Sequence, residues 1–300
     1  DTPFVFVSHF ATLLTEGFHS LHKLSVYISS WDELNTILEA LQHRESQPDF
    51  APLTHLSIGV TPAFELADDQ ADLLVKLLGA FTQLVELWLD PGMFFYLDMD
   101  SLSLGNQLRA LQVSFSGEPA MFLCIEGSAL EHLRLTTLEG TMITIDPLST
   151  CNLRHLEVSA STQSISLLLT SLVDAPPPHL STLILDATLS EGMEAPRFEI
   201  PNLPSLTRLC ATFSAMQERM YLELAIYGSS LRTLELDVAH NIMMTRFELD
   251  AESVPKLERL WIATPPSPRL SVRCNVVVPY LPATLKSVRL PPHWELISAA

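Results

Sequence analysis

The sequence predicts an α/β solenoid, a stack of short repeats whose strands align in one curved parallel sheet. The first observation is a recurring apolar motif, L-x-x-L-x-[LIV], as in LHKLSV, LVELWL, LEHLRL and LERLWI. The second is its spacing, because successive copies begin 22 to 32 residues apart. The third is that the intervals carry helical or alternating apolar patterns suited to the crossovers that parallel strands need. Eleven segments follow the motif closely, and they begin at Leu21, Leu53, Leu84, Leu108, Leu130, Leu153, Leu180, Leu206, Leu231, Leu257 and Leu285.

The spacing of the motif indicates which residues enter the core. Its last two apolar positions are two residues apart, so they point to the same face of a short strand, and the residues beside them point to the other face. Most of the spacings fall within the 20–29 residues of leucine-rich repeats. We therefore expect residues 1–300 to form a single leucine-rich-repeat domain of about eleven repeats. The leucines expected to be buried include Leu87, Leu89, Leu133, Leu135, Leu183, Leu185, Leu234 and Leu236.

The intervals predict crossovers of two kinds. Apolar residues at three- and four-residue spacing predict helices. The segments of this kind are 31–44, 65–81, 164–175 and 215–228. Short alternating segments predict a second set of strands. These segments are 121–127, 142–147, 197–202, 246–251 and 270–276.

Both the beginning of the chain and its cysteines carry information. We expect residues 1–10 to be the tail of an earlier repeat and residues 11–21 to hold its helix, so that the domain is truncated at its N-terminus. The four cysteines lie far apart in sequence, which predicts neither a zinc site nor a dense disulfide framework. Free thiols favour a reducing compartment, so the expected location is the cytoplasm or the nucleus.

The charge of the chain limits its partners. Its formal net charge is −18, from 17 Lys and Arg against 35 Asp and Glu. Such a surface repels phosphate backbones and anionic lipids, so we expect neither nucleic acid nor membrane as a partner. No apolar run reaches the ~20 residues of a membrane span. The electrostatic complement is a protein or peptide of basic character, although the charge also serves solubility alone.

The residues beside the buried leucines are the candidate binding surface. They face the concave side of the predicted sheet and mix polar, charged and aromatic types. Trp88 and Trp261 stand out, because Trp is enriched among binding hot spots and an exposed indole is costly unless something covers it. The alternative is that a loop of the same chain covers each ring. The expected partner-binding residues are Glu86, Trp88, Asp90, His132, Arg134, His155, Glu157, Asp186, Glu235 and Trp261.

Two clusters among these candidate binding residues suggest a particular chemistry. Glu86 and Asp90 flank Trp88 on one strand face, an arrangement that suits an Arg or Lys of a partner. His132, Arg134, His155 and Glu157 are expected on neighbouring strands. This second group has three interpretations, namely solvated surface, a partner contact that responds to pH near 6.5, or a metal site lacking a third ligand.

No motif predicts catalysis, a cofactor or a metal centre. The chain has no GxSxG, no P-loop, no HExxH and no GxGxxG. HSLH (19–22) is a weak HxxH, and the acidic cluster Glu65, Asp68, Asp69 and Asp72 lacks calcium-loop spacing. We therefore expect a binding protein rather than an enzyme, with no cofactor.

The style of the repeats resembles the leucine-rich-repeat part of fungal and plant F-box proteins. The features that carry this resemblance are the irregular repeat length, the missing Asn after the strand, and phrases such as RFEIPNLPSLTRL and RFELDAESVPKLERL. The resemblance implies the substrate-binding subunit of a Skp1–cullin ubiquitin ligase, with Skp1 held by an F-box before the repeats. No F-box is seen in the sequence. The alternatives are a free-standing repeat scaffold without a link to ubiquitin, or an enzyme with a site on the concave face.

Overall fold

The computed structural model describes most of the chain as two compact units. The described residues are 3–61, 68–89, 107–115, 121–123, 129–137, 143–145, 152–189, 197–215, 220–239, 241–249, 252–263, 275–277, 282–290 and 295–297. The first unit comprises residues 1–118, 122–138 and 148–150, and the second comprises 119–121, 139–147 and 151–300. Within each unit the described residues form a parallel-strand solenoid with few helices.

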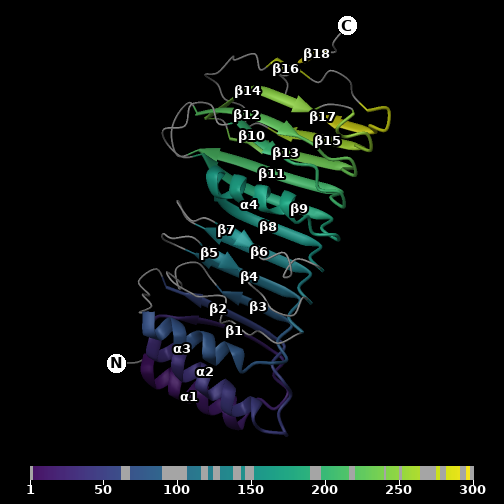
Figure 1. Cartoon of the computed structure of the whole chain (residues 1–300). Helices are drawn as coiled ribbons and strands as arrows, with labels where there is room; N and C mark the ends of the chain where they lie inside the picture. Colours follow the sequence, from purple (N-terminus) through teal and green to yellow (C-terminus); the bar gives the residue numbers. More distant parts are fainter. Residues whose placement is uncertain are drawn as a thin grey trace. The chain divides into compact units, whose positions relative to one another are not determined.

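The first unit contains five parallel strands that neighbour one another in chain order (Figure 1). Their second motif leucines share one register, since Leu24 pairs with Leu56, Leu56 with Leu87, Leu87 with Leu111 and Leu111 with Leu133. This register confirms the predicted alignment of the repeats in this unit. The five strands are β1 (Lys23–Ile28), β2 (His55–Val60), β3 (Glu86–Leu89), β4 (Ala110–Phe115) and β6 (His132–Thr137).

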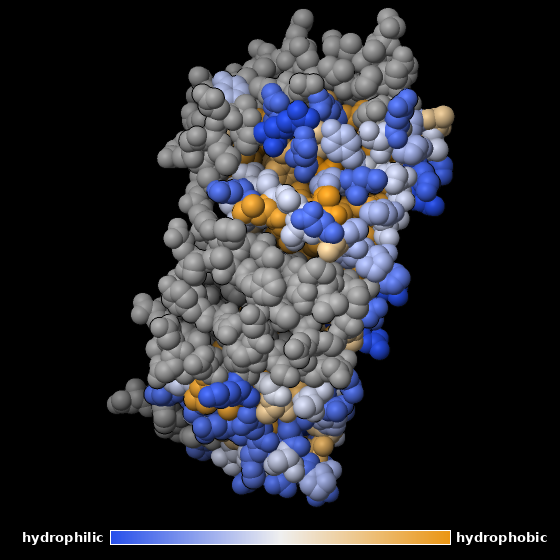
Figure 2. All heavy atoms as spheres, viewed as in Figure 1, coloured by the Kyte–Doolittle hydropathy of each residue, from blue (hydrophilic) through white to orange (hydrophobic). Residues whose placement is uncertain are grey.

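Three helices accompany the first strands of this unit. They are α1 (Pro3–Glu16), α2 (Trp31–Glu45) and α3 (Asp68–Gly79). The Ser30 hydroxyl caps α2 by accepting the Glu33 N–H at 3.3 Å, and acidic residues in the first turn suit the helix dipole. The apolar stripes of α2 and α3 are buried, as Leu34, Leu38 and Leu78 show. Hydrophilic residues predominate on the described outer surface at this N-terminal end (Figure 2).

The second unit has two strands in most turns of the solenoid. One sheet has the order β8 (His155–Ser161), β9 (Thr182–Leu189), β11 (Arg208–Ala215), β13 (Thr233–Val238), β15 (Arg259–Ala263) and β17 (Ser287–Arg289). The other has the order β10 (Arg197–Ile200), β12 (Met220–Ile226), β14 (Ile242–Leu249), β16 (Asn275–Val277) and β18 (Glu295–Ile297). The rings of Phe198 and Phe213 meet edge to face between the two sheets, with centroids 5.4 Å apart. One helix, α4 (Thr162–Asp174), lies between β8 and β9 in the chain.

Two short strands complete the described elements, β5 (Met121–Leu123) and β7 (Ile143–Ile145), both within segments predicted as strands. All eight leucines expected in the core are buried, with 0–2 % of their surface exposed. Among the described residues, no helix combines the length and the apolar character needed to cross a membrane.

Two sequence predictions are wrong. Residues 215–228 were expected to be helical, but the structure places strand β12 there, with Leu222, Leu224 and Ile226 buried. Residues 1–10 were expected to be the tail of an earlier repeat separate from a following helix. Instead, a single helix begins at Pro3 and runs to Glu16, a start that suits proline because its missing N–H has no helical partner there.

A backbone ladder joins successive repeats where the strands begin. Within each unit, one carbonyl of a repeat accepts the N–H groups of two consecutive residues in the next repeat; the Arg154 carbonyl, for example, accepts from Ser181 at 2.9 Å and Thr182 at 3.0 Å. Hydroxyl groups of Thr54, Ser181 and Thr207 donate to the same carbonyls. The ladder therefore fixes the register before each strand starts. Its acceptors are His22, Thr54, Val85 and Arg109 in the first unit, and Arg154, Ser181, Thr207, Arg232 and Glu258 in the second.

Candidate recognition surface

The residues that flank the buried leucines form the open face of each sheet, the face opposite its core. On β3, Leu87 and Leu89 are fully buried while Trp88 between them is exposed. On β6, Leu133 and Leu135 are buried while His132 and Arg134 are exposed. Side chains of unlike chemistry therefore line up across the strands. The open face of the first unit consists of Lys23, Ser25, His55, Ser57, Glu86, Trp88, Gln112, His132 and Arg134.

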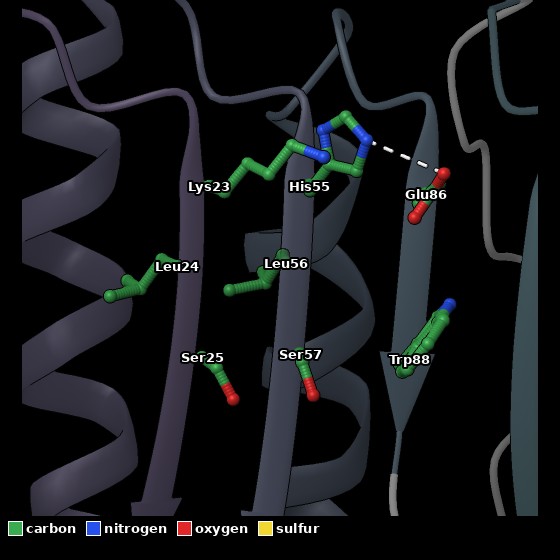
Figure 3. A pocket seen from close by; sticks show the side chains of 8 residues that line it. All are labelled: Lys23, Leu24, Ser25, His55, Leu56, Ser57, Glu86 and Trp88. Atoms are coloured by element: carbon green, nitrogen blue, oxygen red, sulfur yellow. Dashed lines mark ion pairs between the residues drawn. The ribbon is translucent and has the colours of Figure 1, made fainter.

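A pocket of about 330 Å³ lies on this open face, across β1, β2 and β3 (Figure 3). The helices lie behind the strands in this view, away from the polar side chains of the pocket. The pocket is lined by Lys23, Leu24, Ser25, His55, Leu56, Ser57, Glu86 and Trp88. It thus joins an indole, apolar side chains, two hydroxyls and three ionisable groups within one site.

Trp88 is the largest side chain in the pocket. It is 48 % exposed, so the chain leaves about half of the ring open to solvent. Its register neighbours are Ser57 on β2 and Gln112 on β4. Ser57 is small and Gln112 is polar, so neither side chain buries the indole. The rest of the chain therefore covers only about half of the Trp88 ring.

A chain of polar contacts orients the ionisable end of the pocket. The Thr54 hydroxyl donates to the His22 carbonyl at 3.0 Å, so it accepts from Nδ1 of His55, which is 2.8 Å away. Nε2 of His55 then faces Oε1 of Glu86 at 3.4 Å, and the two form an ion pair when the imidazole is protonated. Lys23 is the register neighbour of His55 on the side away from Glu86. The pocket therefore holds a carboxylate near Trp88 and a cation two strands away.

In the second unit, two of the predicted acidic residues have defined partners. Asp186 is exposed and accepts a hydrogen bond from the Ser159 hydroxyl at 3.1 Å. Glu235 receives Nη2 of Arg208 at 3.2 and 3.3 Å and the Cys210 thiol at 3.4 Å. Burial raises the pKa of Cys210, and the Glu235 carboxylate raises it further. The carboxylate of Glu235 is therefore largely occupied within the sheet.

Trp261 is 47 % exposed on β15, so its ring too is not fully covered. Its register neighbour on β17 is Arg289, whose guanidinium carbon lies 4.9 Å from the indole centroid. Arg289 was not among the residues predicted from the sequence to bind a partner. The sequence could have indicated Arg289, because it occupies the same strand position in its repeat as Trp261 does in the preceding repeat.

The predicted binding residues are divided between the two units. Glu86 and Trp88 share the pocket, whereas Asp90 lies outside the described residues. His132 and Arg134 belong to the first unit, and the half-buried His155 and Glu157 belong to the second. Sequence reasoning missed the roles of Lys23, Ser25, His55 and Ser57, although each occupies the same strand positions as Glu86 and Trp88.

The described residues contain no group of three or more His, Cys, Asp or Glu side chains arranged to hold a metal ion. The side chains of the acidic cluster Glu65, Asp68, Asp69 and Asp72 lie outside the described part of the structure. Comparison of the chain with protein-family models, with characterised proteins and with solved structures finds no significant match.

Proposed function

We propose that the chain is a protein-recognition module of the leucine-rich-repeat type, which binds its partner on the open face of the first unit. The observation that supports this proposal is the half-exposed Trp88 in a pocket built from three neighbouring strands. An aromatic ring held rigidly by a sheet loses little conformational entropy on binding. The pocket supplies both apolar contact and hydrogen-bonding groups, as interface anchors do.

The proposed partner presents an Arg or Lys side chain to Trp88. A cation over the indole gains a cation–π contact, and Glu86 on the same strand is exposed over 39 % of its side chain and can receive an ionic hydrogen bond. The net charge of −18 favours a partner that is basic overall. Lys23 lies two strands from Trp88, so its charge opposes only a cation placed at the far end of the pocket.

A labelled peptide of alternating Arg and Gly residues tests this proposal by fluorescence anisotropy. Trp88→Ala should weaken binding by about 2 kcal/mol, roughly 30-fold, if the ring is a hot spot. Tyr221→Ala is the matched control, since Tyr221 is 45 % exposed but lies in the other sheet of the second unit.

A second pair of variants separates local from general attraction. Glu86→Gln should weaken binding, whereas Glu39→Gln, which removes the same charge from the exposed surface of α2, should not. Equal losses from both members of either pair would contradict a site at Trp88, and so would the absence of saturable binding to the wild-type chain.

The resemblance in repeat style extends this proposal to the substrate-binding part of an F-box-type ubiquitin-ligase adaptor. The full-length protein should then co-purify with Skp1 when the two are expressed together. A full-length protein that binds its partner through the open face but never retains Skp1 would instead be a free-standing repeat scaffold.

A further inference from the structure

The charge of this chain is unevenly distributed. The whole chain carries −18, yet residues 252–290 hold six Lys and Arg residues against two Asp and Glu residues. The strands β15 and β17 lie within this segment. A local excess of positive charge in a strongly acidic chain indicates a surface with its own binding preference.

Two arginines and a tryptophan share the open face of these strands. Arg259 and Trp261 flank the buried Leu260 on β15, and both are exposed. Arg289 on β17 is also exposed, and its guanidinium carbon lies over the Trp261 ring, 4.9 Å from the centroid. The register pairs Trp261 with Arg289 and Arg259 with Ser287, so the two guanidinium groups belong to adjacent strands on one face.

The hydrogen-bond donors of both arginines are uncommitted within the described part of the chain. No described carboxylate lies within 4.0 Å of either guanidinium group. The acidic residue in register with Trp261 is Glu235, and its carboxylate already pairs with Arg208. The contact with the indole uses none of the Arg289 N–H groups in a hydrogen bond to a described carboxylate, so the guanidinium group can bind a carboxylate of a partner with two hydrogen bonds.

We propose that the open face of β15 and β17 binds an acidic peptide segment, with carboxylates on Arg259 and Arg289 and an apolar contact on Trp261. This site goes beyond the binding proposed at Trp88, because it lies in the other unit and has the opposite charge preference. A peptide fits better than a nucleic acid, since a chain of −18 repels a dense line of phosphates more strongly than a few carboxylates. The planar carboxylate also matches the fork of the guanidinium group.

The test is binding of fluorescein-labelled hexaglutamate, followed by anisotropy in buffered salt near 0.15 M. An acidic chain has no general attraction for this probe, so saturable binding requires a local cationic site. Arg289→Gln and Arg259→Gln should each weaken binding by about fivefold or more. Lys256→Gln is the matched control, because Lys256 is exposed in the turn before β15, outside the open face, and its loss removes the same charge.

Further arms distinguish the possible failures. Arg289→Lys keeps the charge but loses the planar fork, so it should weaken binding even if Arg289→Gln proves unstable in thermal melts. Trp88→Ala should leave hexaglutamate binding unchanged, which separates this site from the one in the first unit. No saturable binding, equal weakening by Lys256→Gln, or tighter binding of octathymidylate through the same arginines would overturn the acidic-peptide proposal.

Discussion

Arg44, at the end of α2, is a fully buried cation in the core of the first unit. Its Nη2 donates to the Leu21 carbonyl at 2.6 Å, its Nη1 lies 3.2 Å from Glu45, and its guanidinium lies 5.5 Å from the Phe50 centroid. Glu45 in turn accepts the Leu53 N–H at 2.7 Å. Burial lowers the pKa of Arg44 from its ordinary value, while Glu45 opposes this change by favouring the charged form. These contacts tie the end of α2 to the residues before β1 and β2.

Removal of this side chain should be strongly destabilising. Arg44→Ala empties a fully buried position and leaves the half-buried Glu45 without its cationic partner, so we expect a loss of about 3–5 kcal/mol in the free energy of unfolding. His43→Ala, at the exposed neighbouring position, should cost less than about 0.5 kcal/mol. Urea unfolding followed by circular dichroism measures both, and similar losses would show that the Arg44 contacts contribute little.

Cys210 should be a slow nucleophile. Burial and the Glu235 carboxylate raise its pKa, so at pH 8 less of it is thiolate than of an ordinary exposed thiol. Glu235→Gln removes the neighbouring charge and lowers that pKa, and alkylation of Cys210 by iodoacetamide should then be faster. Asp237→Asn, an exposed position on the same strand, should leave the rate unchanged. Peptide mass spectrometry isolates the Cys210 rate, and an unaltered rate in Glu235→Gln would contradict the assigned cause.

At the scale of single residues, the position of a residue within its strand predicted its exposure better than its residue type did. Trp88, Glu86 and Trp261 stand out in the sequence by their chemistry, and their exposure follows from the alternation of the strand. Ser57 and His55 are unremarkable residue types in sequence. Only the register of β2 beside β3 places them in the pocket, and that register depends on interval lengths that differ from repeat to repeat.

The strands, as elements, should divide sharply into a buried and an open face. Leu133 on β6 is 1 % exposed, and Leu133→Ala should cost about 2–5 kcal/mol because it empties a packed position. Thr136 on the same strand is partly exposed, and Thr136→Ala should change stability by less than about 0.5 kcal/mol. Equal shifts of the urea midpoint for the two variants would show that the assignment of faces on β6 is incorrect.

The helices and strands differ in how well their sequences predict them. The segment of α2 carries a Ser cap, acidic residues in its first turn and a regular apolar stripe, all of which favour a helix. The segment of β12 contains MYLELAI, in which Leu222, Leu224 and Ile226 fit alternation and other apolar pairs fit helical spacing. Pairing with β10 and β14 decides between them, because those neighbours offer backbone partners to a strand.

For the whole molecule, the repeat motif predicted the stacking of parallel strands. The composition did not predict where on the molecule the charged residues gather. The net value of −18 averages over surfaces that differ in charge, since Arg259 and Arg289 share the open face of β15 and β17 while Asp32 and Glu39 are exposed on α2. Local recognition depends on side chains within a few ångströms, which an average over 300 residues cannot reveal.

The net charge should instead affect the rate at which the chain associates with a basic peptide. Binding of the arginine peptide should slow as salt rises from about 0.05 to 0.5 M, because screening weakens long-range attraction, while dissociation should change less. Stopped-flow fluorescence measures both rates. An association rate that does not depend on salt would indicate that the overall charge plays no part in encounter.

The shared-carbonyl ladder predicts the pattern of hydrogen–deuterium exchange. The first amide of each ladder pair, such as Thr54, Thr207 or Arg232, precedes its strand and would exchange within seconds if solvent were its only acceptor. The ladder should instead protect this amide as strongly as those inside the strand, and the protection should recur once per repeat. Rapid exchange at these amides beside slow exchange in the strands would mean that each repeat opens at its start independently of its neighbours.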